Sequence, residues 1–286
     1  MNSIEQYQGG EERVNWEKLR NVDRRVLYVL IIIVIALALI KPIGFAILPS
    51  EDTIKAYNAI DALPSGSVVY LGMEFGASGI PELMPQIQSI IRQGFRKDLK
   101  FVAGGLWTES GSLAEKAFSI VSDEFPGKQY GVDWVNIGYK PGGEVVLEKM
   151  VSSIYEACVG VDYYGNDLNS LPLMAQVPTL KDVDLIAVFC TGTPGEREYI
   201  RHVTSPYNVP IIAGLIAVNA PQAMPLVQAG QLITVLTGMK SGAEYEVLVG
   251  VPGLASAGMD AQSFTHALIL VFIILGNLGY FLGGRK

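Results

Sequence analysis

The chain has 286 residues, of which 50% are hydrophobic and 17% are charged, against about 25% charged in an ordinary soluble protein. This excess of apolar residues favours a membrane protein. The formal net charge of −7 argues against a nucleic-acid partner, because phosphate binding requires clustered Lys and Arg residues. A length about twice that of a typical domain allows one large domain with additional segments, or two small domains.

The first apolar segment covers residues 26–48 and begins with VLYVLIIIVIALALI. A transmembrane helix needs about 20 apolar residues, and the segment reaches this length if Lys41 extends its ammonium group to the membrane surface. The alternative is a signal peptide, because residues 36–38 resemble a cleavage site. However, residues 1–25 form a polar tail with five acidic residues, unlike the short basic region of a signal peptide. We therefore expect a retained membrane anchor.

Between residues 50 and 262, short β-type runs alternate with amphipathic helical stretches. The expected strands cover residues 67–75, 100–107, 130–139, 184–190, 210–218 and 231–238. The expected helices cover residues 81–97, 112–125, 144–158, 194–203, 221–229 and 243–249. This alternation predicts an α/β domain with a doubly wound, mainly parallel sheet of the Rossmann-like or flavodoxin-like type. It leaves the order of the strands open.

The connection at 159–182 is unusually long for a compact domain. Connections of this length are commonly functional or form an inserted interaction element. It follows Cys158, which together with Cys190 makes only two cysteines, too few for a disulfide framework. The two could pair in an oxidising compartment, but their apolar surroundings favour buried free thiols.

The second apolar segment covers residues 264–284 and has the length of a second transmembrane helix. The alternative is a buried core helix, but core helices rarely lack a polar face over this length. The stretch 250–262 before it is rich in small residues and is expected to be a short linker. Small residues and an amide within the span suit helix packing, within the chain or between chains. These candidate packing residues are Gly276, Asn277, Gly279 and Gly283.

The charges beside the two apolar segments predict the orientation of the chain in a lipid bilayer. Five Lys and Arg residues precede the first segment and two follow the second, whereas few lie at the opposite ends. The positive-inside rule therefore places both termini in the cytoplasm and residues 50–262 outside the cell membrane.

Small and turn-forming residues follow every expected strand, and in an open parallel sheet these strand ends share the edge where ligands bind. Helix N-termini at this edge suit an anion. The candidate ligand-binding residues are Lys140, Gly142, Gly143, Thr191, Thr193, Lys240 and Ser241. The same residue types are also required for turns and helix caps alone. Neither GxxxxGK[ST] nor GxGxxG occurs, so no cofactor and no metal is expected.

Signatures of catalysis are largely missing from the sequence. No GxSxG, HExxH or paired CxxC motif occurs, and the chain has two histidines, His202 and His266. His202 is best interpreted as a residue on a helix surface. Glu74 and Asp133 lie in or near expected strands and could be catalytic, but we interpret them as salt-bridge partners at the margin of the sheet.

Four stretches, GYKPGGE, DLIAVFCTGTPG, QLITVLTGMKSGAEYE and GMDAQS, resemble parts of an uncharacterised prokaryotic family of two-pass membrane proteins with an extracytoplasmic α/β domain. The resemblance covers most of the domain and the second span, and it implies no activity and no catalytic residues. The alternation is also similar to one lobe of a periplasmic sugar-binding-type protein. The strands suffice for one lobe only, so a ligand cleft between two lobes is not expected.

These observations leave three functional hypotheses. The first is a membrane-anchored, non-catalytic α/β subunit that forms a homo-oligomer or assembles with other membrane proteins. The second is an extracytoplasmic receptor module that binds a small anion at the strand ends. The third is a hydrolase or transferase that acts at the membrane surface.

Overall fold

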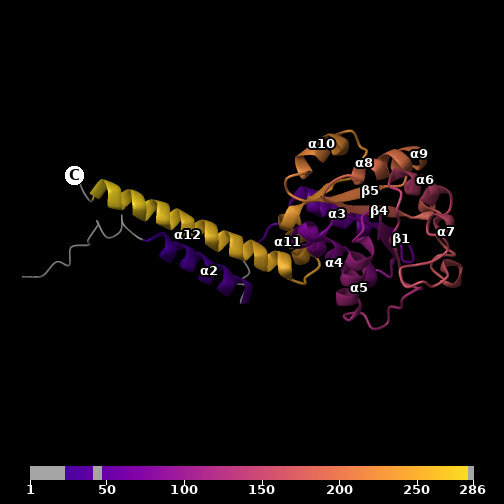
Figure 1. Cartoon of the computed structure of the whole chain (residues 1–286), viewed down its shortest axis with the longest axis horizontal. Helices are drawn as coiled ribbons and strands as arrows, with labels where there is room; N and C mark the ends of the chain where they lie inside the picture. Colours follow the sequence, from indigo (N-terminus) through magenta and orange to yellow (C-terminus); the bar gives the residue numbers. More distant parts are fainter. Residues whose placement is uncertain (1–22, 41–46, 283–286) are drawn as a thin grey trace, which may run out of the picture. The chain divides into compact units, whose positions relative to one another are not determined.

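The computed structural model describes residues 23–40 and 47–282 (Figure 1). It divides into two compact units. One contains the α/β domain and covers Gly44–Met259, and the other contains the residues up to Ile43 and from Asp260 onward. Each unit is described by itself below.

The domain is built on one six-stranded sheet in which all strands are parallel. The strands are β1 (Val68–Glu74), β2 (Lys100–Gly105), β3 (Trp134–Tyr139), β4 (Leu185–Cys190), β5 (Ile211–Leu215) and β6 (Val235–Thr237). Their order, β3-β2-β1-β4-β5-β6, is that of the Rossmann fold and not of flavodoxin. The predicted doubly wound α/β fold is thus confirmed, and the strand order now places its switch point between β1 and β4.

Helices cover both faces of the sheet (Figure 1). They are α3 (Glu51–Asp61), α4 (Ile80–Arg96), α5 (Ser110–Ser122), α6 (Glu144–Ser152), α7 (Ile154–Ala157), α8 (Glu196–Tyr199), α9 (Ser205–Tyr207), α10 (Ala220–Gln228) and α11 (Gly238–Leu248). A π-helical turn, Ile200–Thr204, joins α8 to α9. Alternate residues of β1 enter opposite cores: Val69 and Leu71 pack with α3, α4, α5 and α11, whereas Val68 and Tyr70 pack with α6, α7, α8 and α10.

Three expected element bounds require correction. The last strand is shorter than residues 231–238, and α11 begins at Gly238 rather than at 243, because this glycine has a positive φ of 59° and turns the chain directly into the helix. The third strand begins at Trp134 rather than at 130, after a turn closed by a hydrogen bond from the Gly131 amide to the Trp134 carbonyl. Helix α3 has no counterpart among the expected elements.

The long connection 159–182 covers the exposed edge of β3. The Tyr163 amide donates to the Asn136 carbonyl at 2.9 Å, and the Tyr130 hydroxyl donates to Asp162 Oδ2 at 2.7 Å. An uncovered edge strand presents unpaired backbone groups that favour aggregation, so a covering segment protects the sheet. Its predicted role in function or interaction stays a prediction.

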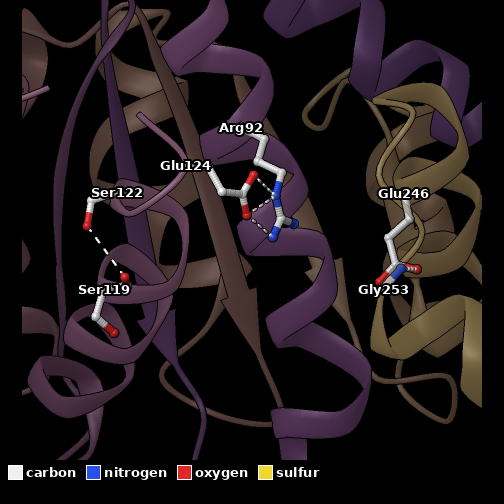
Figure 2. A network of polar contacts seen from close by, with 6 residues as sticks. All are labelled: Arg92, Ser119, Ser122, Glu124, Glu246 and Gly253. Atoms are coloured by element: carbon white, nitrogen blue, oxygen red, sulfur yellow. Dashed lines mark hydrogen bonds and ion pairs between the residues drawn. The ribbon is translucent and has the colours of Figure 1, made fainter. Parts of the chain in front are cut away.

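Two buried carboxylates on α11 bind the segments at which the chain enters and leaves the domain. Glu244 accepts hydrogen bonds from Ser50 Oγ at 2.6 Å and from Thr53 Oγ1 at 2.5 Å, at the start of α3. Glu246 accepts from the amides of Gly253, Ala255 and Ser256 at 2.8 to 3.0 Å, and from Ser256 Oγ at 2.6 Å. Figure 2 shows Glu246 beside Gly253. Both ends of the domain are therefore fastened to one helix.

A bidentate ion pair joins α4 to the turn after α5 (Figure 2). Arg92 Nη2 and Nε donate to the Glu124 carboxylate at 2.7 to 2.9 Å. The Arg92 side chain is only 10% exposed, so this pair is shielded from solvent more than an ordinary surface ion pair.

The last helix, α12 (Leu254–Leu282), is the one helix of the described ranges long and apolar enough to cross a membrane. It begins ten residues before the expected start at 264, because Glu246 accepts the free amides of its first turn and so starts the helix within the expected linker. At 29 residues it is about 43 Å long, more than the roughly 30 Å of a bilayer core.

The first apolar segment forms α2 (Arg24–Ile40). Residues 41–46 of the predicted first span, and residues 1–22 of the predicted tail, lie outside the described residues. Residues 47–50 are not helical, so the span does not continue as a helix to Leu48. Pro49, which cannot donate to a helical carbonyl, accounts for the break before α3.

Candidate functional site

The carboxyl ends of β1 and β4 lie at the point where the strand order reverses. Their last residues, Glu74 and Cys190, are partners in the register of the sheet. In open α/β sheets, ligands bind in the crevice outside this point, because the loops on its two sides run in opposite directions.

Side chains of this protein close the crevice directly above the switch point. The Trp107 indole, which follows β2, reaches across and donates its Nε1–H to the Pro194 carbonyl at 3.1 Å. On the other side, Gly79 packs so closely against Thr191 that a Cβ there would lie 2.7 Å from Thr191 Cγ2. The loops after β1, β2 and β4 therefore interlock, and open space is found to one side of them.

A cavity of about 300 Å³ lies between the loops after β4 and β5. Its volume is at the lower end of the range for ligand pockets. The lining combines hydroxyl, amide, guanidinium and carboxylate groups with a smaller share of apolar surface. The residues are Cys190, Thr191, Gly192, Thr193, Glu196, Arg197, Glu198, Leu215, Asn219 and Gln222.

Backbone contacts hold the polar groups of this cavity in place. The Asn219 side chain, which precedes α10, donates from Nδ2 to the Thr191 carbonyl at 2.9 Å. Arg197 Nη2 donates to the Gln222 carbonyl at 3.1 Å, which joins α8 to α10. The loops after β4 and β5 are thus connected across the cavity on two sides.

The Cys190 thiol donates to Glu196 Oε2 at 3.1 Å, at the inner end of the cavity. Burial, together with the charge of Glu196, raises the pKa of Cys190 well above its usual value. The sulfur is therefore a protonated thiol at neutral pH and a poor nucleophile. Both cysteines are free and buried, and no disulfide joins Cys158 to Cys190.

Carboxylates of the protein occupy backbone donors that an anion would need at this edge. Glu82 Oε2 accepts from the Ala217 amide at 2.8 Å, Glu198 Oε2 from the Gly195 amide at 2.7 Å, and Glu74 Oε2 from the Leu106 amide at 2.8 Å. Because these amides already donate to carboxyl groups of the protein, the edge is poorly suited to an anionic ligand.

Glu74 is completely buried behind the switch point. Its Oε1 accepts from the Tyr199 hydroxyl at 2.6 Å. Burial raises its pKa to about 7, although the hydrogen bonds from Tyr199 and Leu106 lower it. The close approach requires Gly105, where a Cβ would lie 2.8 Å from Glu74 Oε1. The interpretation of Glu74 as a salt-bridge partner is wrong, because no cation among the described residues pairs with it and its partners are a phenol and a backbone amide.

The structure brings together only part of the candidate ligand-binding set. Thr191 and Thr193 line the cavity. Lys140, Gly142 and Gly143 follow β3, at one edge of the sheet, whereas Lys240 and Ser241 lie on α11 after β6, at the other. Five strand intervals of about 4.8 Å place these two groups roughly 24 Å apart.

The separated groups each have local partners. Lys140 Nζ donates to the Val161 carbonyl at 3.3 Å, and Lys240 Nζ pairs with Glu244 Oε1 at 3.0 Å. Ser241 Oγ accepts from the Thr237 amide at 2.8 Å, which is a turn contact. The glycines at 142 and 143 have φ of 127° and 58°, which only glycine adopts readily.

The other residues considered for catalysis lie away from the cavity. His202 Nε2 is 2.8 Å from Glu144 Oε2 of α6, and the pKa of Glu144 is lowered, first by this hydrogen bond. Asp133 pairs with Lys128 at 3.2 Å, which confirms its interpretation as a salt-bridge partner. His266 lies within α12. No cluster of three or more metal-ligating side chains occurs in the described ranges.

Five polar residues that line the cavity are not among the candidates predicted from the sequence, namely Glu196, Arg197, Glu198, Asn219 and Gln222. Of these residues, Asn219 could have been identified from the sequence, because it follows an expected strand and precedes a proline at the start of a helix. No family model matches the chain, and the comparisons with curated proteins and with solved structures gave no match. The fold class accordingly rests on the strand order.

Proposed function

We propose that the chain is a membrane-anchored, non-catalytic module that binds a small, uncharged, hydroxylated molecule at the cavity between the loops after β4 and β5. The observation that carries the proposal is this cavity, lined by donors and acceptors at the edge where open α/β sheets bind ligands. The protonated Cys190 thiol, and the position of His202 beside Glu144 and away from the cavity, favour binding over catalysis.

The lining supports an uncharged ligand. Hydroxyl groups both donate and accept, and so suit Glu196 as an acceptor and Arg197, Asn219 and Gln222 as donors. An anion would meet the carboxylates of Glu196 and Glu198 in the same cavity. A sugar or another polyol of monosaccharide size is therefore the ligand class that we propose.

The ligand is tested by titration of the purified chain with a panel of monosaccharides and polyols, followed by calorimetry. The variant Gln222→Ala removes one amide from the cavity, and we expect its Kd for the ligand to rise about tenfold, because an unpaired ligand hydroxyl costs about 1 to 2 kcal/mol. Gln228→Ala, an exposed position on the same helix outside the cavity, is the control and should bind as the unmodified chain does.

Two lysine variants separate this proposal from the anion hypothesis. If a phosphate or a carboxylate compound binds instead, and Lys140→Ala or Lys240→Ala weakens it, the anion hypothesis is correct and the polyol proposal fails. Unchanged polyol binding in both variants is the expected result.

The hydrogen bonds that Glu244 and Glu246 of α11 make to the two ends of the domain support a two-pass anchor. Ser50, held by Glu244, follows the first apolar segment closely, and the residues held by Glu246 begin α12. Both apolar segments would then leave the domain from one helix, as expected if they enter the same bilayer. We propose that both termini are cytoplasmic and that the domain is extracytoplasmic.

The topology is tested with single introduced cysteines and a membrane-impermeant maleimide on intact cells. Both natural cysteines are buried and give a low background. We expect Gln228→Cys in the domain to be labelled on intact cells, and Ser3→Cys in the N-terminal tail only after permeabilisation. The reverse pattern would place the domain in the cytoplasm.

Assembly into an oligomer is the second proposal, supported by the uncovered glycine on α12. A Cβ built on Gly276 would meet no described atom within 4 Å, and the neighbouring Asn277 is exposed among apolar residues of the same helix. Such a face suits a partner helix. Gly279 is buried, and Gly283 lies outside the described residues. Native mass spectrometry in mild detergent tests the proposal, and a strictly monomeric chain would contradict it.

A further inference from the structure

A second cavity, of about 420 Å³, lies beside the edge strand β3 and shares no lining residue with the cavity between the loops after β4 and β5. Aromatic rings and carboxylates line it. The residues are Glu115, Phe118, Ser119, Ser122, Asp123, Tyr130, Trp134 and Tyr164. They come from α5, from the start of β3 and from the connection 159–182 that covers this edge.

The Tyr130 ring is nearly perpendicular to two neighbouring rings, those of Tyr164 and Trp134. The Tyr130 ring is 5.1 Å from the Tyr164 ring at 82° and 6.0 Å from the Trp134 ring at 83°. Trp134 in turn stacks on Phe118 with an interplanar angle of 13°. All four of these aromatic residues line the same cavity, which we call the aromatic cage.

Hydrogen bonds outside the rings fix the cage and determine its electrostatics. The Tyr130 hydroxyl donates to Asp162 Oδ2 at 2.7 Å, and the Tyr164 hydroxyl donates to the Glu115 carboxylate. Both phenols therefore use their protons on carboxylates. Tyr164 is 51% exposed, so its ring is held in position by this contact with α5 more than by burial.

The charged side chains that line the cavity all have one sign. Glu115 and Asp123 line it, Asp162 lies behind Tyr130, and no Lys or Arg is among the described residues that line the cavity. The ring faces of Tyr and Trp carry negative potential from their quadrupoles, which adds to that of the carboxylates. A cation is attracted by both, and an anion is repelled by both.

We propose that this cavity binds a small organic cation with a methylated ammonium group. Methyl groups contact aromatic rings without hydrogen bonds, so such a cation can bind although both phenol protons are already donated to the carboxylates of Asp162 and Glu115. This site is separate from the cavity at the ends of β4 and β5, and it does not depend on the proposed polyol binding.

The test uses the full chain in a maltoside detergent, which has no ammonium group, and titrates it with choline and tetramethylammonium in parallel. Binding is measured by calorimetry and by quenching of Trp134 fluorescence in a background in which the two other tryptophans, Trp16 and Trp107, are replaced by phenylalanine. We expect saturable binding of both cations and none of 3,3-dimethyl-1-butanol, the uncharged analogue of choline with the same shape.

Variants assign the binding to the cage. Tyr164→Ala should raise the Kd for choline about tenfold or more, since a desolvated cation–π contact contributes up to about 2 kcal/mol. Glu115→Gln should raise it several-fold while retaining the ring. Tyr155→Ala, an exposed tyrosine outside the cavity, should leave the Kd unchanged. Circular dichroism confirms that each variant is folded, and Tyr164→Leu, which keeps an apolar side chain but removes the ring, serves if Tyr164→Ala fails to fold.

Each outcome decides the proposal. Equal binding of the uncharged analogue, binding of methyl glycosides but of neither cation, or no saturable binding would overturn it. If binding is confirmed, nanodiscs with phosphatidylcholine identify the source of the group: competition with choline indicates a lipid headgroup, and lack of competition indicates a soluble cation.

Discussion

Replacing Glu246 by alanine is expected to lower the free energy of unfolding of the α/β domain by roughly 3 kcal/mol. The side chain is 2% exposed and accepts four hydrogen bonds from the residues that start α12. Its loss leaves buried donors without a partner, each of which costs about 1 to 3 kcal/mol, and removes negative charge from a helix N-terminus. The total cost is smaller than the sum of these contributions, because the turn at 250–253 can relax and expose some of the donors to solvent.

The measurement is thermal unfolding of the full chain in detergent, combined with limited proteolysis of residues 250–259. The variant should melt earlier and be cleaved faster at this junction. Val247→Ala, a half-exposed position on the same helix, is the matched control. Glu246→Gln retains the size of the side chain and one acceptor oxygen, so its melting temperature should lie between those of Glu246→Ala and the unmodified chain. Equal melting temperatures of the Glu246→Ala variant and the unmodified chain would show that α12 starts without this carboxylate.

Glu74→Gln is expected to remove a pH dependence from the stability of the domain. The pKa of Glu74 is raised from 4.5 to about 7 in the folded chain, chiefly by burial. Below pH 4.5 the Glu74 carboxyl is protonated in both the folded and the unfolded chain, so burying it does not reduce the free energy of unfolding. Between 4.5 and about 7 the unfolded chain loses the proton while the folded chain keeps it, so stability falls as the pH rises. Above pH 7 the free energy of unfolding has fallen by its full amount, roughly 3 kcal/mol.

The glutamine mimics the protonated acid. Its amide oxygen accepts from the Leu106 amide, and its amide nitrogen donates to the Tyr199 hydroxyl oxygen, so the variant should be more stable than the unmodified chain above pH 7 and nearly equal to it at pH 4.5. Chemical denaturation at several pH values measures this difference. The exposed carboxylate Glu156 is the control, replaced by glutamine. Parallel pH profiles for the Glu74→Gln variant and the unmodified chain would refute the expectation.

The candidate site could be predicted only in part, and particular residues show why. Thr191 and Thr193 were identifiable because polar turn residues follow a buried strand in the sequence. Lys140 and Lys240 follow strands in the same way, and nothing local distinguishes them from the two threonines. Only the strand order, with β3 and β6 at opposite edges, separates the lysines from the cavity and from each other.

Glu74 and Glu246 illustrate a second limit. A carboxylate in a sequence is expected to be solvated or paired with a cation, and both residues bind backbone amides or a hydroxyl instead. Their partners come from other segments, or from a turn whose geometry the local pattern does not specify. The aromatic cavity is of the same kind, because Tyr130, Trp134 and Tyr164 meet only when the connection 159–182 lies along β3.

By itself, the sequence determined the class of the fold and the presence of an apolar helix near the C-terminus that could span a membrane. Both depend on periodicity and on runs of apolar residues, which are local properties that burial in a core or in lipid imposes directly. The tertiary structure alone decided the strand order, the position of the two cavities and the binding of both ends of the domain by α11. These depend on contacts between residues distant in the sequence, and the free energy of such contacts is set by packing and hydrogen-bond geometry that no local pattern encodes.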